Sequence, residues 1–271
     1  MSERRVRVER DGHVARVILD RPEKRNALDL AMFEGIDAAA REVSADPEIR
    51  AVVLCGEGRS FCAGLDLAAI AAGPEAIAKL ASRREGEMAN LAQRVAWAWR
   101  ECPVPVIAAL QGEVFGGGLQ VALGADIRIA APDVRLSVME VRWGLVPDMA
   151  GTQTLRRVVR RDVALELTWT GRIVGGEEAR ALGLVTRISP EPLEAATALA
   201  TEIADRSPEA VRAAKRLFDR AWDADAGEAL ALEERMQRWL LSGPNQREAV
   251  RAGMAGEKPG FRAPRSFDDE R

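Results

Sequence analysis

Residues 104–130, VPVIAALQGEVFGGGLQVALGADIRIA, decide the fold of this chain. Their first part, residues 104–110, is a nearly continuous apolar run, which is typical of a strand covered on both faces. A turn with three successive glycines follows at residues 111–118, and residues 119–126 then have helical spacing. A further strand is expected at residues 127–131. This succession of strand, turn, helix and strand predicts an α/β protein.

The same order of elements occurs once upstream. An apolar strand is predicted at residues 49–55 (IRAVVLC), a turn at residues 56–64 (GEGRSFCAG) and a helix at residues 65–72. Further upstream, apolar residues alternate along residues 6–20, which predicts a β-hairpin that turns at Asp11-Gly12. The recurring strand–turn–helix unit indicates one α/β core.

Helices are predicted for most of the remaining chain. Helical spacing extends over residues 27–43, 72–102 and most of 152–255. We therefore divide the chain into a core that carries the candidate site, residues 1–195, and a C-terminal all-helical region, residues 196–271. The last stretch, residues 257–271, is polar and contains Pro and Gly, so we interpret it as a mobile tail or a docking arm.

Composition excludes several classes of function. The chain has 271 residues, 47% of them hydrophobic, and a net charge of −3, which offers no electrostatic footprint for nucleic acid. No apolar run approaches the ~20 residues that cross a bilayer, and the charged N-terminus lacks the apolar region of a signal peptide. The three cysteines have no CxxC spacing and are interpreted as free thiols in a reducing compartment. We expect a cytoplasmic protein without a nucleic-acid or membrane partner.

The residues that are absent from the sequence narrow the chemistry further. There is one histidine, His13, and no tyrosine. A Ser-His-Asp triad would have to use His13, which lies in the predicted hairpin turn. A zinc site needs several His ligands or paired Cys ligands, and the sequence contains neither, so no metal site is expected. The GxGxxG, GxxxxGK[ST] and GxSxG motifs are missing. An enzyme of this composition would work with carboxylates and backbone dipoles.

Both glycine-bearing turns lead into a predicted helix, where the first N–H groups have no intrahelical partner and the dipole is positive. Gly64 would let the chain turn so that the N–H of Leu65 points into a cleft, and the glycines around Gly117 repeat the arrangement. Two converging N–H groups would stabilise an oxyanion by roughly 3 kcal/mol per donor. The alternative is that the glycines only let helices pack tightly on strands. Two turns at corresponding positions favour the oxyanion hole.

A carboxylate accompanies these turns. Glu140 stands among apolar residues in SVMEVRWGLVPDMAG, and such surroundings raise a carboxylate's pKa toward the range of a general base. Asp148 follows it after Pro147. The alternative is that Glu140 caps a helix or pairs with Arg142 or Arg135, and the pattern alone leaves both interpretations open.

Several segments carry a resemblance that covers nearly the whole chain. They are residues 21–28 (RPEKRNAL), 61–67 (FCAGLDL), 112–130, 140–155 (EVRWGLVPDMAGTQTL) and 207–217 (SPEAVRAAKRL). Together they make the sequence similar to the crotonase (enoyl-CoA hydratase/isomerase) superfamily. The resemblance implies a spiral of ββα units and a C-terminal helical region that forms homotrimers, often paired into hexamers.

The resemblance also implies the substrate. In such an enzyme the N–H groups of Leu65 and Gly117 bind the thioester oxygen of an acyl-CoA and stabilise an enolate. Coenzyme A enters as part of the substrate, and no tightly bound cofactor is implied. The residues expected along the substrate are Arg25, Ala27, Ala63, Asp66, Leu67 and Gly116. Arg262 and Arg265 of the tail could touch CoA phosphates, but a solvated basic face is the favoured interpretation for them.

One position departs from the family pattern. Family hydratases carry two glutamates that hold and activate a water. Glu140 matches the second, whereas Gln120 stands in place of the first, and an amide can orient a water but cannot exchange a proton near neutral pH. A single carboxylate suffices to move a proton between two carbons of an enolate. Double-bond isomerisation is therefore slightly favoured over hydration, with Glu140 as the principal acid/base and Gln120 as a polar orienter.

Asp148 supports the same preference. In the dienoyl-CoA isomerase branch an aspartate follows the matching glutamate at this spacing, although that branch has an acidic residue at the position of Gln120. The alternatives are a CoA-ester binding protein without turnover, or another enolate reaction such as decarboxylation or ring closure. The acyl pocket, which would decide between reactions, is expected to be lined by residues 72–102 with Trp97 and Trp143.

Overall fold

The structure, a computed structural model, describes residues 4–68 and 73–267. A six-stranded sheet has the order β1-β2-β3-β4-β6-β9, and a three-stranded sheet has the order β5-β7-β8. The strands of the larger sheet are β1 (Val6–Asp11), β2 (Val14–Leu19), β3 (Ala51–Gly56), β4 (Val106–Leu110), β6 (Ile127–Ala130) and β9 (Arg187–Ile188). Those of the smaller sheet are β5 (Glu113–Phe115), β7 (Arg135–Ser137) and β8 (Val174–Gly175).

The predicted N-terminal hairpin is confirmed. β1 and β2 pair antiparallel with Asp11 opposite Val14, and Gly12 in the turn has a φ of +55°. From β2 onward the neighbours in the larger sheet pair parallel. Successive strand pairs β4–β5, β6–β7 and β8–β9 each give one strand to each sheet, so the chain advances as a spiral. The predicted turn at residues 111–118 therefore contains a short strand, β5.

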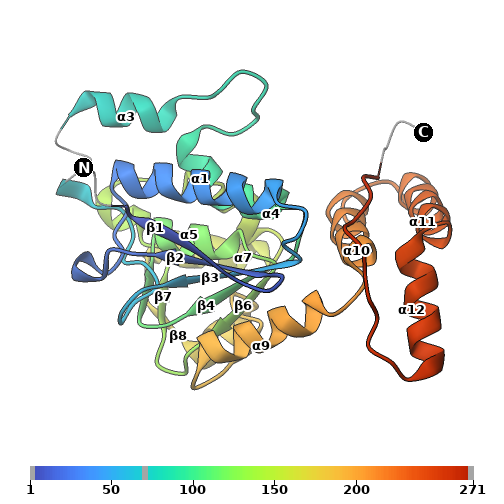
Figure 1. Ribbon diagram of the computed structural model, residues 1–271. Coiled ribbons are helices and arrows are strands. Elements are labelled where there is room, and N and C mark those ends of the chain that lie inside the picture. The colour runs from blue at the N-terminus through green and yellow to red at the C-terminus, as the bar shows by residue number, and fades with distance from the viewer. Residues whose placement is uncertain (1–3, 69–72, 268–271) are drawn as a thin grey trace.

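The apolar strands are covered on both faces, as their composition predicts. In β3, Leu54 faces a large core shared with α1 (Leu30–Ala45) and α4 (Leu91–Glu101). Val53 faces the opposite side, where it packs with Ala196 and Ala200 of α9 (Pro192–Ala204). Figure 1 shows α1 and α4 on one side of the sheet and α9 on the other.

The other helices are α3 (Pro74–Ala81), α5 (Gly117–Leu123), α6 (Gly151–Leu155), α7 (Arg161–Thr170), α8 (Gly176–Leu182), α10 (Pro208–Ala221), α11 (Ala226–Leu241) and α12 (Pro244–Ala255), with short 3₁₀ turns at η1 (Pro22–Lys24) and η2 (Glu140–Trp143). Within residues 4–68 and 73–267, none combines the length and apolarity needed to cross a bilayer. α1 begins three residues later than predicted, because the Asp29 side chain caps it by accepting from the N–H of Met32.

The single helix predicted over residues 72–102 is wrong. The structure has two helices, α3 and α4, joined by residues 82–90. Asn90 and Gln93 form a reciprocal capping box that starts α4 as a new helix, and Gly86 with a φ of +78° lies in the connection. Of the helix predicted at residues 65–72, the last four residues lie outside the described part of the chain.

The C-terminal helices form a separate layer. The predicted domain boundary at residue 195/196 falls inside α9, whose later residues still pack on the sheet. Beyond it, α10, α11 and α12 stand apart from the sheet (Figure 1) and share a small core of Ala213, Leu232 and Met236. The division into core and helical region stays a prediction.

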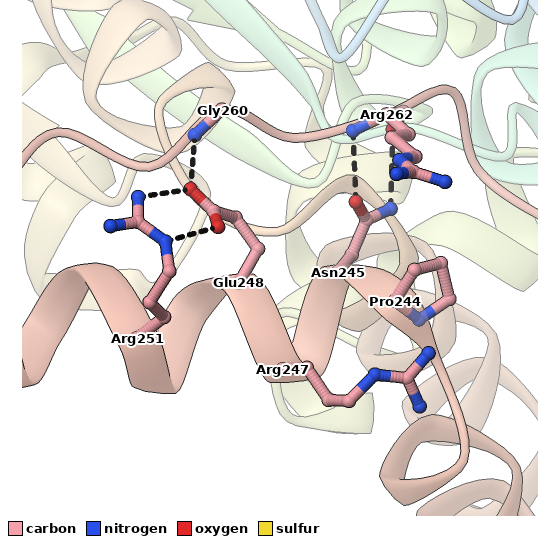
Figure 2. Close-up of a pocket in the computed structure, with 7 residues that line it drawn as sticks. All are labelled: Pro244, Asn245, Arg247, Glu248, Arg251, Gly260 and Arg262. Atoms are coloured by element: carbon pink, nitrogen blue, oxygen red, sulfur yellow. Dashed lines mark hydrogen bonds and ion pairs between the residues drawn. The ribbon is translucent and has the colours of Figure 1, made fainter.

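The chain after α12 returns along the helices as an extended strap, residues 257–267. Figure 2 shows how it is attached to α12. The Asn245 side chain accepts from the N–H of Arg262 (2.9 Å) and donates to its carbonyl (3.1 Å). Glu248 accepts from the N–H of Gly260 (2.8 Å). Of the two interpretations of the tail, the described part matches an arm that docks, here on its own helices.

Candidate active site

The N–H of Leu65 is oriented by a short parallel bridge between Leu28 and Leu65. In this bridge Leu28 donates to the carbonyl of Gly64 (2.8 Å), and its own carbonyl accepts from the N–H of Asp66 (3.0 Å). Because a strand alternates the direction of its backbone groups, these bonds use the groups that flank Leu65, and the N–H of Leu65 points to the other side. Leu65 lines a cavity there.

The second turn lies directly against the first. Gly64 has a φ of +91°, and a Cβ there would stand 2.7 Å from the carbonyl oxygen of Phe115. Gly116 has a φ of +50° and precedes α5, so the N–H of Gly117 belongs to the first turn of that helix. Among the described residues, no hydrogen bond occupies the N–H of Leu65 or that of Gly117. Both residues line the same cavity.

The alternative role of the glycines, close packing, holds at a different glycine. A Cβ on Gly118 would stand 2.5 Å from the carbonyl oxygen of Cys62, so α5 packs against the first turn only because that position is glycine. The two interpretations thus apply to adjacent positions of one turn.

The cavity has a volume of about 570 Å³ and a mainly apolar wall. Its apolar lining side chains include Phe33, Leu67, Ile77, Leu80, Trp143, Leu145, Val146 and Met149. Of the two tryptophans predicted to line an acyl pocket, Trp143 lines this cavity. Trp97 does not, because its side chain faces a different hollow between α4 and α10.

Glu140 brings a carboxylate to this cavity from the start of η2. It is 8% exposed. Its Oε1 accepts a hydrogen bond from Nε2 of Gln120 (2.5 Å), and its Oε2 is buried without a hydrogen-bond partner among the described residues. A Cβ on Gly116 would stand 3.4 Å from Oε1, which places the carboxylate beside the second turn. The alternative pairing with Arg135 does not occur, since Arg135 faces Glu113 (3.8 Å).

The surroundings of Glu140 raise the pKa of its carboxyl above the usual range. Burial is the main cause, because it disfavours the charged form. The hydrogen bond from Gln120 opposes the rise, and the negative charge of Asp148 adds to it. Asp148 lines the cavity and is exposed. Asp148 is therefore close enough to influence the titration of Glu140.

Gln120 lies behind Glu140 and is 2% exposed. Its Nε2 is used on Glu140 and its Oε1 accepts from the N–H of Met149 (2.9 Å). It is not among the residues that line the cavity. The amide thus faces Glu140 and the backbone instead of the cavity.

The residues expected along the substrate fall into two groups. Ala63, Leu67 and Gly116 line the cavity. Arg25, Ala27 and Asp66 do not line it and lie beside residues 63–65, which do. Arg25 accepts through its carbonyl from the N–H of Ala63 (2.9 Å), and Arg21 bridges Ala27 and Asp66, donating to the carbonyl of one (3.1 Å) and to the carboxylate of the other (2.8 Å).

The tail arginines lie elsewhere. Arg265 is bound to Glu209, a glutamate whose side chain is fully buried. Arg262 lines a polar hollow between α12 and the strap (Figure 2), and this hollow contains none of the candidate catalytic groups. His13 bonds through Nδ1 to the carbonyl of Glu48 (2.8 Å) at the hairpin. No group of three or more His, Cys, Asp or Glu within the described ranges could hold a metal ion.

Sequence reasoning missed two contributors to the site. The Leu28–Leu65 bridge orients one N–H, and its only trace in the sequence is the apolar Leu28 at the end of RPEKRNAL. The N–H of Met149 fixes the Gln120 amide, and a backbone group has no sequence signal of its own.

Comparisons with known proteins agree with this geometry. The sequence model of the family described as enoyl-CoA hydratase/isomerase matches residues 9–262. A short-chain-enoyl-CoA hydratase of Clostridium acetobutylicum is 32% identical over 248 residues, covering 90% of this chain and 92% of the relative. The mitochondrial Delta(3,5)-Delta(2,4)-dienoyl-CoA isomerase of Rattus norvegicus is 35% identical over 239 residues, covering 85% and 72%.

The fold agrees as well. The crystal structure of an enoyl-CoA hydratase from Bacillus anthracis superposes with a TM-score of 0.86 at 29% identity, covering 96% of this chain and 99% of that one. The spiral core with its C-terminal helices is thus the crotonase fold. The chain belongs to the enoyl-CoA hydratase/isomerase family and is an enzyme of that family.

Proposed function

We propose that this enzyme moves a proton along unsaturated acyl-CoA thioesters, with double-bond isomerisation favoured over hydration. One observation carries the preference. Glu140 is the one buried carboxylate among the described residues that line the cavity, its Oε2 has no hydrogen-bond partner among them, and the residue behind it is Gln120, an amide. The N–H groups of Leu65 and Gly117 bind the thioester oxygen and stabilise the enolate that forms when a proton leaves C2.

The proposed cycle balances with the chain's own groups. Oε2 of Glu140 takes the proton from C2 of a 3-enoyl thioester, and the negative charge moves to the thioester oxygen. Protonated Glu140 then gives the proton back at C4, which shifts the double bond to C2–C3. For a 3,5-dienoyl thioester the proton is added at C6 by Asp148, the proposed second acid/base, and proton exchange of both carboxyls with solvent restores the starting state. Ala63, Leu67 and Gly116 are proposed to contact the acyl-CoA in the cavity, and Arg25, Ala27 and Asp66 to lie along its CoA part.

Gln120 is proposed to act on Glu140 and not on a water. Its Nε2 donates to Glu140 and its Oε1 accepts from the N–H of Met149, and these two bonds fix the carboxylate in one orientation. Hydration needs a second group that exchanges a proton with the attacking water, and an amide does not supply one. The named relatives include both a hydratase and an isomerase, so the family alone does not favour either reaction.

Substrate turnover tests the proposal directly. Purified protein would be incubated with 2-enoyl-, 3-enoyl- and 3,5-dienoyl-CoA, and the conjugated thioester followed by ultraviolet absorbance. We expect the 3-enoyl or 3,5-dienoyl substrate to be converted faster than the 2-enoyl substrate is hydrated. Rapid hydration with an untouched 3-enoyl substrate would overturn the isomerase preference. Tight binding without any turnover would support the CoA-ester binding alternative.

Restoring the missing carboxylate tests the role of position 120. We expect Gln120→Glu to raise hydration of 2-enoyl-CoA by at least about ten-fold, at the low end of what one general acid/base contributes. The measurement is the loss of absorbance of the conjugated thioester, with Gln153→Glu, an exposed glutamine on α6, as the control. If the hydration rate of Gln120→Glu does not rise, the lack of a carboxylate at position 120 is not what limits hydration in this enzyme.

The pH dependence should report the coupling of the two carboxylates. A general base acts in its deprotonated form, so kcat/KM should rise with pH through the pKa of Glu140, which lies above the usual range. Because Asp148 raises that pKa, Asp148→Asn should move this limb to lower pH. Gln120→Leu removes the hydrogen bond that lowers the pKa and should move the limb to higher pH. If the acidic limb of the kcat/KM profile stays at the same pH in both variants, a group other than Glu140 causes that limb.

Assembly and location also remain proposals. We propose that the enzyme works in the cytoplasm as a homotrimer or a pair of trimers. Phe218 of α10 and Trp222, the residue that ends this helix, have side chains that are 60% and 66% exposed and rings in tilted contact (5.7 Å between centroids), as expected of a surface that a second copy covers. Light scattering after size-exclusion chromatography would give the mass of the assembly.

A further inference from the structure

An ionic cluster with a buried central carboxylate lies next to α3, a helix that lines the cavity. Asp37 of α1 has a side chain that is 2% exposed. Its carboxylate accepts hydrogen bonds from three guanidinium groups, those of Arg41 (3.1 Å), Arg84 (2.7 Å) and Arg94 (2.9 Å). A second carboxylate, Glu87, is bound to Arg41 and lies 3.6 Å from the Arg84 guanidinium. We call these five residues the Asp37 cluster.

The charge of the cluster is balanced well enough to keep Asp37 ionised. Burial alone would raise the pKa of the Asp37 carboxyl, but the hydrogen bonds from Arg84, Arg94 and Arg41 outweigh it and lower that pKa. A buried carboxylate with three charged donors is strongly oriented, because leaving the Asp37 carboxylate without its partners in the interior is costly.

The cluster holds a segment that has few other anchors. Arg84 and Glu87 belong to residues 82–90, which join α3 to α4. In this connection Met88 is 69% exposed and Ala89 is the buried apolar residue. No residue of α3 itself is buried. Apolar burial is the main source of local stability, so a segment with so little of it depends on its polar contacts.

This weakly buried segment forms one wall of the cavity. Ile77, Leu80 and Ala81 of α3 line it, whereas Asp37 and Arg84 do not. Apart from the cluster, an ion pair between Lys79 and Glu34 joins α3 to α1, with both side chains about half exposed. Exposed pairs of this kind contribute little to stability. Leu80 packs partly buried against the large core, and the cluster, whose central carboxylate is buried, is the principal polar tie at the C-terminal end of α3.

We propose that Asp37 is a positioning residue that holds α3 against the cavity and thereby sets the affinity for long acyl chains. The inference rests on the proposed acyl-CoA function for its substrate. At about 570 Å³ the cavity is of a size that encloses a whole small ligand. A four-carbon acyl group held at Leu65 fills only part of that volume, whereas a ten-carbon chain has to use the α3 wall.

The test compares binding of two unreactive thioesters, butanoyl-CoA and decanoyl-CoA, by titration calorimetry. Arg84→Gln removes the link from the connection itself; its side chain is 59% exposed, so the variant should fold. Asp37→Asn removes the centre of the cluster. Each buried methylene is worth about four-fold in affinity. We therefore expect both variants to bind decanoyl-CoA at least about ten-fold more weakly and butanoyl-CoA within about two-fold of wild type.

The matched control is Asp162→Asn, the same chemical change at an exposed aspartate that pairs with Arg160 on the surface of α7. It should leave both affinities unchanged. Hydrogen exchange of residues 73–90 should accelerate in the two cluster variants, and that of β3 and β4 should not. With a 3-enoyl substrate of ten carbons, KM should rise while kcat is retained.

The possible failures are distinct. If wild type binds neither thioester, the acyl-CoA function fails and the positioning role with it. If wild type binds both and Arg84→Gln weakens them equally, or neither, then the positioning role alone is overturned. Should Asp37→Asn not fold, Arg84→Gln alone decides the outcome.

Discussion

Replacing Glu140 by glutamine should lower turnover of the preferred enoyl-CoA substrate by about 10³-fold, within the range that a positioned general acid/base supplies. The amide has nearly the size of the carboxylate, and its oxygen can still accept the hydrogen bond from Gln120. What it loses is the ability of the buried Oε2 to take a proton. The measurement is kcat and kcat/KM by ultraviolet absorbance at a pH above the pKa of Glu140.

Binding separates loss of chemistry from loss of structure in this variant. Glu140→Gln should bind butanoyl-CoA as wild type does, because the N–H groups and the cavity wall are untouched. Glu234→Gln, the same change on the exposed face of α11, should leave turnover unchanged. If Glu140→Gln turned over more than about a tenth of wild type, a different group would be the base.

Replacing Gly64 by alanine should lower kcat/KM by about 10²-fold or more, the usual cost of losing one oxyanion donor. The new Cβ would meet the Phe115 carbonyl oxygen at 2.7 Å, and the φ of +91° is one that alanine rarely adopts. Relief of either conflict turns the backbone between Gly64 and Leu65, and the Leu65 N–H leaves its direction. The measurement is kcat/KM together with the melting temperature Tm.

Gly12→Ala is the matched control for this backbone change. Gly12 also has a positive φ, +55°, but a Cβ there would meet nothing within 4 Å. It should lower Tm through backbone strain and leave kcat/KM unchanged. Gly117→Ala offers a second probe. Gly117 does not have a positive φ, so alanine brings no backbone strain there, but its Cβ would displace the Met149 sulfur and the Leu28 side chain. Full activity in both site variants would contradict the oxyanion hole.

Much of the fold could be predicted because its signals are local. Apolar runs placed β3 and β4, and an Asp-Gly pair placed the first hairpin. The single helix expected over residues 72–102 failed because Asn90 and Gln93 start a second helix, and capping competes with helical spacing that looks continuous. The short strand β5 was missed for a different reason. It pairs with β7, which is distant in the sequence, and no local sequence pattern indicates such a pairing.

The site was predictable where residue type carries the chemistry. Glu140, Asp148 and the two glycine turns lie at one cavity, as expected from their sequence context. The direction of Gln120 was not predictable, because it depends on the N–H of Met149. The direction of Trp97 was not predictable either. On α4 the side chain of Trp99 faces the core and that of Trp97 faces α10, and the sequence alone does not fix how a helix is rotated about its axis.

The parallel pairing of β3 with β4 also has a consequence for how this protein folds. The two strands are joined by a crossover that contains the Leu65 turn, α3, the connection at residues 82–90 and α4. Long crossovers of this kind close late, because the entropy of the loop is lost before the contacts that compensate it form. The N–H groups of Leu65 and Gly117 can therefore converge only once that crossover has docked. During folding, thioester binding should therefore appear only when the sheet is complete, and helices that form earlier should not bind the thioester.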